Sequence, residues 1–145
     1  MQDGATTITF FDRTYDEAFS LLVEARDYLA DRHEVPELLA PQIQLVASCE
    51  TMRLTSRLVQ VMAWLLVQKA VHAGEIDPVE AGAPLRRLGG REICAEPGPW
   101  DMSGLPRRLR ALLDRSHALY NRVARLDEMV HIRASQARAR DEHTV

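Results

Sequence analysis

The sequence predicts an all-α protein, a three-helix bundle with a long central helix and a long crossover between its second and third helices. Three observations lead to this prediction. Aromatic residues make up only 6% of the 145 residues, whereas leucine, alanine and arginine are abundant, which favours helices over sheets. Apolar residues recur at alternating steps of four and three in three stretches, as one face of a helix requires. The stretch between the second and third, residues 74–104, is rich in glycine and proline.

The first helix is expected from about Tyr15 to Asp31, after a polar, extended leader formed by residues 1–13. Thr14 and Glu17 match a capping box, in which two side chains satisfy free backbone N–H groups of the first turn. The side chains expected to face the core are Phe11, Tyr15, Ala18, Leu22, Ala25 and Leu29.

The second helix is expected from about Gln42 to Ala73, and a short connector containing Pro36 and Pro41 returns it antiparallel to the first. Residues 58–67 include a single polar side chain, so this helix must be covered on more than one side, by other helices or by a second subunit. The main stripe, expected at the centre of the core, holds Leu45, Cys49, Met52, Ser56, Val59, Ala63, Leu66 and Ala70. A second stripe beside it holds Ala47, Leu54, Leu58, Val61 and Leu65.

The crossover, residues 74–104, is long for a compact domain, and such connections are often functional or mobile. Asp77 and Pro78 predict a short capped helix within it. The alternative is a structural connection that caps one end of the bundle, with Trp100 as its anchor.

The third helix is expected from about Pro106 to Arg133. Residues 135–145 carry too little apolar surface to be ordered by burial, so we expect a disordered tail after a single domain of residues 1–134. The apolar stripe of this helix holds Leu105, Leu109, Leu112, Ser116, Leu119, Val123, Leu126 and Val130.

Charge is unevenly distributed along a chain whose net charge is −3. Residues 1–40 hold nine acids and three arginines, a net of −6, whereas residues 105–145 hold nine arginines and five acids, a net of +4. The simpler interpretation is attraction between the first and last helices across the bundle. The other is a basic surface for nucleic acid, which the balanced total charge disfavours.

No pattern in the sequence indicates an enzyme, a cofactor or a metal. There is no glycine-rich phosphate loop or paired-cysteine metal motif, and His117 and His131 are about 21 Å apart along a helix, too far to share a metal. Cys49 and Cys94 do not form a disulfide framework. No signal peptide or membrane-spanning run is visible, so a cytoplasmic protein that does not enter the membrane is expected.

A third stripe of the second helix is the most informative candidate site. It is polar at its start and apolar at its end, with a tryptophan in the middle, which is typical of protein interfaces. We therefore predict a homodimer through this face; the alternative is that residues 74–104 fold back over it. The predicted interface residues are Arg53, Arg57, Gln60, Trp64, Val67 and Val71.

Two strings resemble a known family: TMRLTSRLVQVMAWLLVQKAV in the second helix and LPRRLRALLDRSHALYNRVARLD in the third. They are similar to the regulator of CtrA degradation family (RcdA) of alphaproteobacteria, over most of residues 15–127. The resemblance implies a dimeric three-helix bundle that serves as an adaptor in cell-cycle proteolysis, linking cargo to the ClpXP protease together with other adaptors. Better-known members carry a longer flexible C-terminal tail, so the resemblance gives no expectation about tail-dependent functions.

The function expected from these observations is that of a non-enzymatic adaptor. The first alternative is a DNA-associated regulator that uses the arginine-rich third helix. The second alternative is a small enzyme, which no motif supports.

Overall fold

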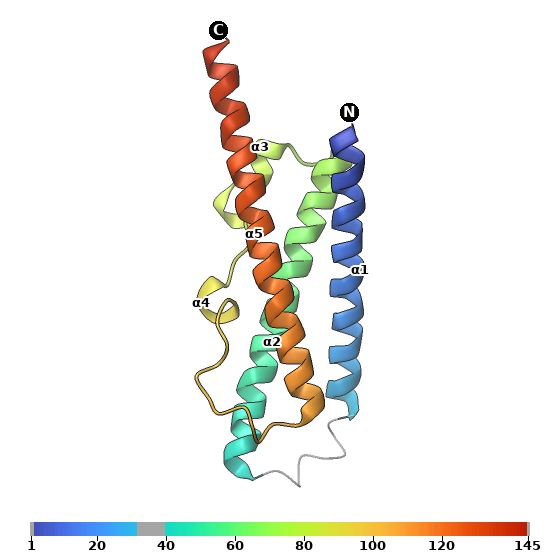
Figure 1. The fold of residues 1–145 in the computed structure, drawn as a ribbon, viewed down its shortest axis with the longest axis vertical. Helices are drawn as coiled ribbons and strands as arrows, with labels where there is room; N and C mark the ends of the chain where they lie inside the picture. Colours follow the sequence, from blue (N-terminus) through green and yellow to red (C-terminus); the bar gives the residue numbers. More distant parts are fainter. Residues whose placement is uncertain (1, 32–39, 145) are drawn as a thin grey trace.

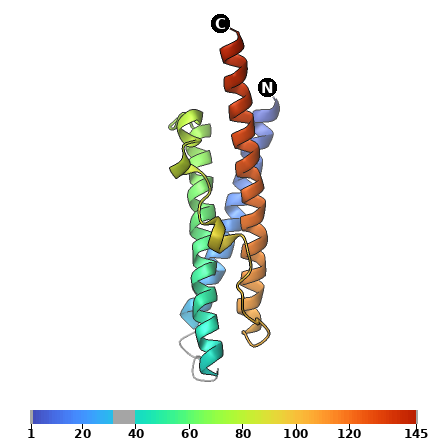
Figure 2. The same cartoon turned by 90° about the vertical axis from the view of Figure 1, so that its left-hand side faces the viewer.

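Three long helices run side by side in the computed structural model, which describes residues 2–31 and 40–144, with side chains from Thr9 onward. They are α1 (Gln2–Asp31), α2 (Pro41–His72) and α5 (Arg107–His143). Two perpendicular views show that α2 and α5 run in the same direction and that α1 runs opposite to both (Figures 1 and 2). The prediction of an all-α three-helix bundle is confirmed. The connector predicted around Pro36 lies outside the described residues.

The crossover between α2 and α5 contains three short elements: α3 (Pro78–Ala81), a 3-10 turn η3 (Pro84–Arg86) and α4 (Arg91–Cys94). Because α2 and α5 are parallel, the chain must travel back along the bundle before α5 can begin, and Figure 1 shows it doing so. The short helix expected after Asp77 is present, and the Asp77 side chain accepts a hydrogen bond from the Val79 backbone N–H at 2.7 Å.

The crossover runs along the bundle instead of capping one end, and Trp100 does not anchor it. The Trp100 side chain is more than two-fifths exposed, whereas Leu88, Cys94 and Leu105 of the same segment are buried in the core. The segment is therefore held by these apolar residues and by polar contacts from α2 and α5.

Helix α1 begins at Gln2, well before the predicted start. Thr14 lies inside the helix, and its hydroxyl donates to the Phe10 carbonyl at 3.0 Å instead of capping a first turn. Phe11 packs edge-on against Trp64 of α2 with ring centroids 5.7 Å apart, a long-range contact that stabilises this earlier turn. The buried residues of α1 are Phe11, Thr14, Ala18, Leu21, Ala25 and Tyr28.

The core side of α2 is the stripe predicted as secondary, and the stripe predicted as central faces outward. Leu54, Leu58 and Leu65 are fully buried. By contrast, Leu45, Met52, Val59 and Leu66 are 67, 71, 56 and 52% exposed. The prediction for the main stripe was wrong because α2 has two apolar sides, and α1 and α5 pack against only one of them.

Helix α5 follows the predicted stripe and continues past the predicted end. Six of the eight stripe residues are buried, and Leu126 and Val130 pack against the same core. Residues 135–143, expected to be disordered, continue the helix to His143, and Figure 1 shows this end projecting beyond the other helices. Side chains here are almost all exposed, and helix-forming alanine, glutamine and arginine residues maintain the local structure.

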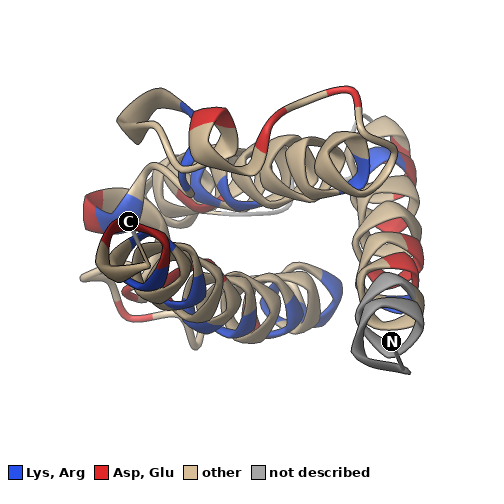
Figure 3. Ribbon diagram, turned by 90° about the horizontal axis from the view of Figure 1, so that it is seen from above, with Lys and Arg blue, Asp and Glu red and all other residues tan. Residues whose placement is uncertain are grey.

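The acidic first helix and the basic last helix are joined by a ladder of ion pairs, as the charge distribution predicted. Arg108 pairs with Asp31 at 2.8 Å, and Arg115–Glu24 and Arg122–Glu17 follow at steps of seven residues on each helix. The opposite numbering agrees with the antiparallel course of α1 and α5, and Figure 3 shows the basic residues along α5 and acidic residues on α1. Each pair is largely solvent-exposed, so the ladder orients the helices more than it stabilises them.

Candidate functional site

Several of the residues predicted as the dimer interface contact the crossover or α5 within the same chain. We call this side of α2 the crossover face; it consists of Arg53, Arg57, Gln60, Trp64, Val67 and Val71. Arg57 and Trp64 are buried, and the other four are half-buried. Residues 74–104 contact Arg53, Arg57 and Gln60 of this face, whereas Trp64 packs against Phe11 of α1 and donates to Asp127 of α5. A dimer contact through this face stays a prediction.

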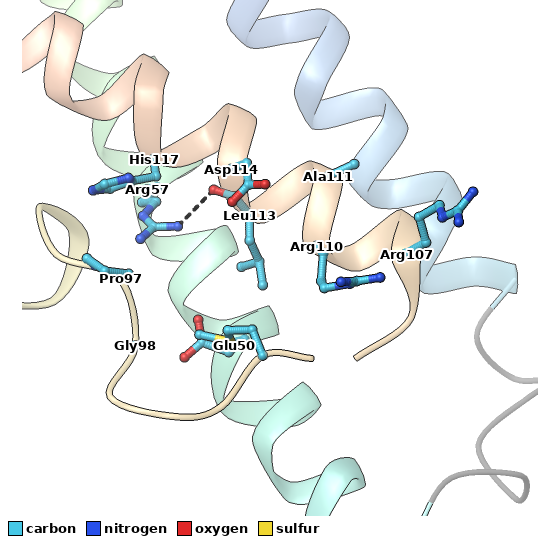
Figure 4. Close-up of a pocket in the computed structure, with 11 residues that line it drawn as sticks. Glu50, Arg57, Pro97, Gly98, Arg107, Arg110, Ala111, Leu113, Asp114 and His117 are labelled. Carbon is cyan, nitrogen blue, oxygen red and sulfur yellow. Dashed lines mark hydrogen bonds between the residues drawn. The ribbon is translucent and has the colours of Figure 1, made fainter. Parts of the chain in front are cut away.

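Arg57 is the centre of the crossover face. Its side chain is 2% exposed, and its guanidinium donates to the carbonyl of Cys94 at 2.9 Å and to that of Glu96 at 3.1 Å in the crossover. On α5 it donates to the Leu113 carbonyl at 3.2 Å (Figure 4) and to the Ser116 hydroxyl, also at 3.2 Å. Burial, with the nearby charge of Arg53, lowers the pKa of this guanidinium. Arg57 thus ties the crossover to α5 and supplies a donor to the Cys94 and Glu96 carbonyls of the crossover.

Further polar contacts hold the crossover backbone to both helices. Gln60 accepts a hydrogen bond from the Gly89 N–H at 3.2 Å, and the Tyr120 hydroxyl donates to the Gly89 carbonyl at 2.7 Å. Burial raises the pKa of Tyr120 to about 12, so this hydroxyl remains a donor at neutral pH. His117 of α5 lies 2.7 Å from the Ala95 carbonyl through Nε2. These groups satisfy backbone atoms of an irregular segment that cannot pair with itself.

Trp64 occupies a second polar junction near the other end of the crossover. Its indole N–H donates to Asp127 of α5 at 2.9 Å. The second oxygen of Asp127 accepts from Arg87 at 3.0 Å and from Arg91 at 3.3 Å. Glu128 also contacts both arginines, and the hydrogen bond from Arg87 lowers the pKa of this exposed carboxyl. A buried carboxylate is therefore shared between an indole and two guanidinium groups, which joins α2, the crossover and α5.

A cavity of about 510 Å³ lies between the crossover and the starts of α2 and α5 (Figure 4). Glu50 lines it with a side chain that is almost fully buried and paired with Arg53 at 3.3 Å. A Cβ atom at Gly98 would lie 1.9 Å from the Glu50 carboxylate, so a larger residue here would require the Glu50 side chain to move. The remaining lining includes Pro97, Met102, Arg107, Arg110, Asp114 and His117.

Three of the polar groups around this cavity are engaged in contacts within the chain, Glu50 with Arg53 and the other two with the crossover. Arg57 and His117 are engaged with crossover carbonyls. Burial raises the pKa of the Cys94 thiol, which makes the nucleophilic thiolate less accessible. Over the described ranges, no three histidine, cysteine, aspartate or glutamate side chains gather as a metal site would require.

The outward side of α2 is an apolar surface whose large side chains remain exposed in the described part of the chain. We call it the outer seam; it consists of Leu45, Cys49, Met52, Ser56, Val59, Ala63, Leu66 and Ala70. Its four large residues recur every seven positions and each is more than half exposed. Contiguous exposed apolar surface of this kind marks sites of interaction with other molecules.

Sequence reasoning found the residues of the outer seam but assigned them to the core. Local spacing does not distinguish the two sides, because Glu50, Arg57 and Gln68 lie on the inward side and are buried there. Arg57 forms hydrogen bonds with residues 37 to 59 positions away in the sequence. These contacts form only when the chain folds, so its burial could not be predicted from local spacing.

Comparisons with known proteins agree with this architecture. A family model described as "Protein of unknown function (DUF1465)" matches residues 3–145. Among solved structures, the crystal structure of RcdA from Caulobacter crescentus CB15 is 39% identical in sequence, with a TM-score of 0.66, over 84% of this chain and 91% of that chain. No curated protein matches at a significant level. In the described residues, no helix has the length and apolar character needed to cross a membrane.

Proposed function

We propose, from the premise that this chain belongs to the DUF1465 family together with RcdA, that it is a non-enzymatic regulatory protein acting as an adaptor. The likeness to RcdA, which extends over 91% of that chain, is the observation that carries the proposal. In this role the chain helps to deliver cell-cycle regulators to the ClpXP protease in the cytoplasm and works as a homodimer.

The surface of the bundle supports an adaptor role because a bridging protein needs more than one contact site. The outer seam is one exposed apolar surface. The crossover carries another set of exposed side chains, Val79, Leu85 and Ile93, of which Leu85 is 100% exposed. The buried polar groups, in contrast, are engaged in holding the crossover.

The test is the half-life of CtrA in the organism that encodes this chain, measured after translation is stopped in wild-type and deletion strains. We expect deletion to lengthen the half-life severalfold and the wild-type gene to restore it. A protein degraded by a different protease serves as the control and should be unaffected. Equal CtrA half-lives in the two strains would contradict delivery to ClpXP.

The DNA-associated alternative draws on the arginines of α5, and its salt dependence separates it from the adaptor. Arg108, Arg115 and Arg122 are paired with acids of α1, which leaves fewer charges for phosphate. Binding through phosphate contacts weakens steeply with salt, with a log–log slope of roughly −0.9 per neutralised phosphate. A steep slope for binding to duplex DNA would favour this alternative over the adaptor.

A further inference from the structure

Gln68 of α2 is buried without a hydrogen-bond partner. It is 5% exposed, and its amide bonds to none of the described residues. The other buried polar side chains in the described part of the chain all have partners: Thr14, Glu50, Arg57, Ser116 and Asp127. Burial of an amide without a hydrogen bond costs free energy, so Gln68 needs a partner that this chain does not supply.

A small cavity between α2, α3 and α5 gives access to this amide. Its volume is about 60 Å³, and Val71, Ala81 and Val130 line it together with the polar Gln68 and Asp127. The Gln68 amide is not among the fully enclosed polar groups, so a ligand in the cavity can reach it. The space holds about two water molecules, or one small polar group of a larger ligand.

The charged groups beside the cavity are paired with one another, which favours a neutral ligand. Asp127 accepts from Trp64 through one carboxylate oxygen and from Arg87 and Arg91 through the other. Both arginines also contact Glu128, so two guanidinium groups face two carboxylates and leave no net charge to attract an ion. The buried Asp127 carboxylate would repel an anion placed next to it, because screening by water is weak there.

We propose that this cavity binds a neutral primary amide, the side chain of a glutamine or asparagine presented by a partner protein. The amide of Gln68 offers two N–H donors and one oxygen acceptor. A second primary amide matches both, because its N–H donates to the Gln68 oxygen while its own oxygen accepts from the Gln68 nitrogen. The cavity admits only this end group, so the rest of the ligand stays outside, where a protein chain adds further contacts. The inference does not depend on the adaptor role.

The first test asks whether the free chain uses the Gln68 amide. Methionine has a similar length and needs no hydrogen-bond partner, so Gln68→Met should leave the Tm of the free chain unchanged or raise it. The comparison is Tyr120→Phe, which removes a buried hydroxyl that donates to the Gly89 carbonyl at 2.7 Å and should lower the Tm. A Gln68→Met variant that melts as far below wild type as Tyr120→Phe would overturn the proposal.

The second test measures binding by NMR titration of the isotope-labelled full chain. The probe is N-acetyl-L-glutamine methylamide, and its anionic counterpart, N-acetyl-L-glutamate methylamide, is the matched control. A single group binds weakly, so the titration extends through the millimolar range. We expect a saturable shift with the glutamine probe alone, at the side-chain amide of Gln68 and the backbone N–H groups of Gly82 and Ala134, which line the cavity.

Two variants separate this site from weak binding elsewhere on the surface. Gln68→Met should lose the saturable shift of the Gly82 and Ala134 N–H groups while keeping its fold. Gln136→Met, which removes an exposed amide of α5, should respond like wild type. An equal response in wild type and Gln68→Met would contradict the assigned site.

The remaining outcomes decide the class of ligand and its source. A stronger response to the glutamate probe would overturn the neutral amide in favour of a carboxylate. No saturable response to either probe would mean that only water fills the cavity and would overturn the site. Tighter binding of the capped glutamine than of free L-glutamine would support a protein side chain as the source, and the reverse order would overturn that source. None of these results bears on the CtrA half-life, which tests the adaptor role by itself.

Discussion

Replacing Arg57 with lysine should destabilise the fold and release the crossover from α5. The guanidinium makes four hydrogen bonds, to the carbonyls of Cys94, Glu96 and Leu113 and to the Ser116 hydroxyl, and it is almost fully buried. Lysine keeps the charge but concentrates its donors on one nitrogen, which cannot reach carbonyls on two separate elements. The buried charge and the carbonyls of Cys94 and Glu96 would then lose hydrogen-bond partners.

The expected loss is about 3–5 kcal/mol of unfolding free energy, the usual consequence of breaking a buried charged network. For a chain of this size, that corresponds to a fall in Tm of roughly 10–16 °C. Denaturant unfolding followed by circular dichroism measures the loss, and hydrogen exchange should rise first in residues 91–104. The control is Arg125→Lys, at an exposed position of α5, with an expected change within about 0.5 kcal/mol. Unchanged stability and unchanged exchange in Arg57→Lys would refute the assigned role of this residue.

Two other predictions concern the core and the end of α5. Leu65→Ala should lower the unfolding free energy by about 2–5 kcal/mol in chemical denaturation, because Leu65 is fully buried, whereas Leu85→Ala at a fully exposed position should change it little; equal losses would contradict the orientation of α2. Truncation after Ala134 should leave the Tm nearly unchanged in calorimetry, because residues 135–143 are exposed; a fall of many degrees would mean that this end packs against the bundle.

The helices themselves could be predicted from the chain because their information is local. The apolar stripe of α5 follows from the spacing of its apolar residues. The bounds of α2 follow from Pro41 before it and Gly74 after it, and the observed bounds differ from the predicted ones by about one residue at each end. The attraction between α1 and α5 could also be predicted, since opposite charges were concentrated at the two ends of the chain. The start of α1 could not be predicted, because Thr14 resembles an N-cap but the helix already begins at Gln2.

The orientation of α2 was decided only by the tertiary structure. Periodicity shows which residues share a face, but α2 has apolar side chains nearly all round, so Leu58 and Val59 are equally good core candidates by sequence. Burial of Glu50 and Arg57 resolves the choice, because their partners at Arg53, Cys94, Leu113 and Ser116 come mostly from elements distant in the sequence. A polar side chain can enter the core only where folding supplies its hydrogen-bond partners, and that supply cannot be read from local spacing. The sequence alone therefore determined the helices and the opposite charges that pair α1 with α5. Only the packing of the bundle determined which side of α2 is buried and which remains exposed.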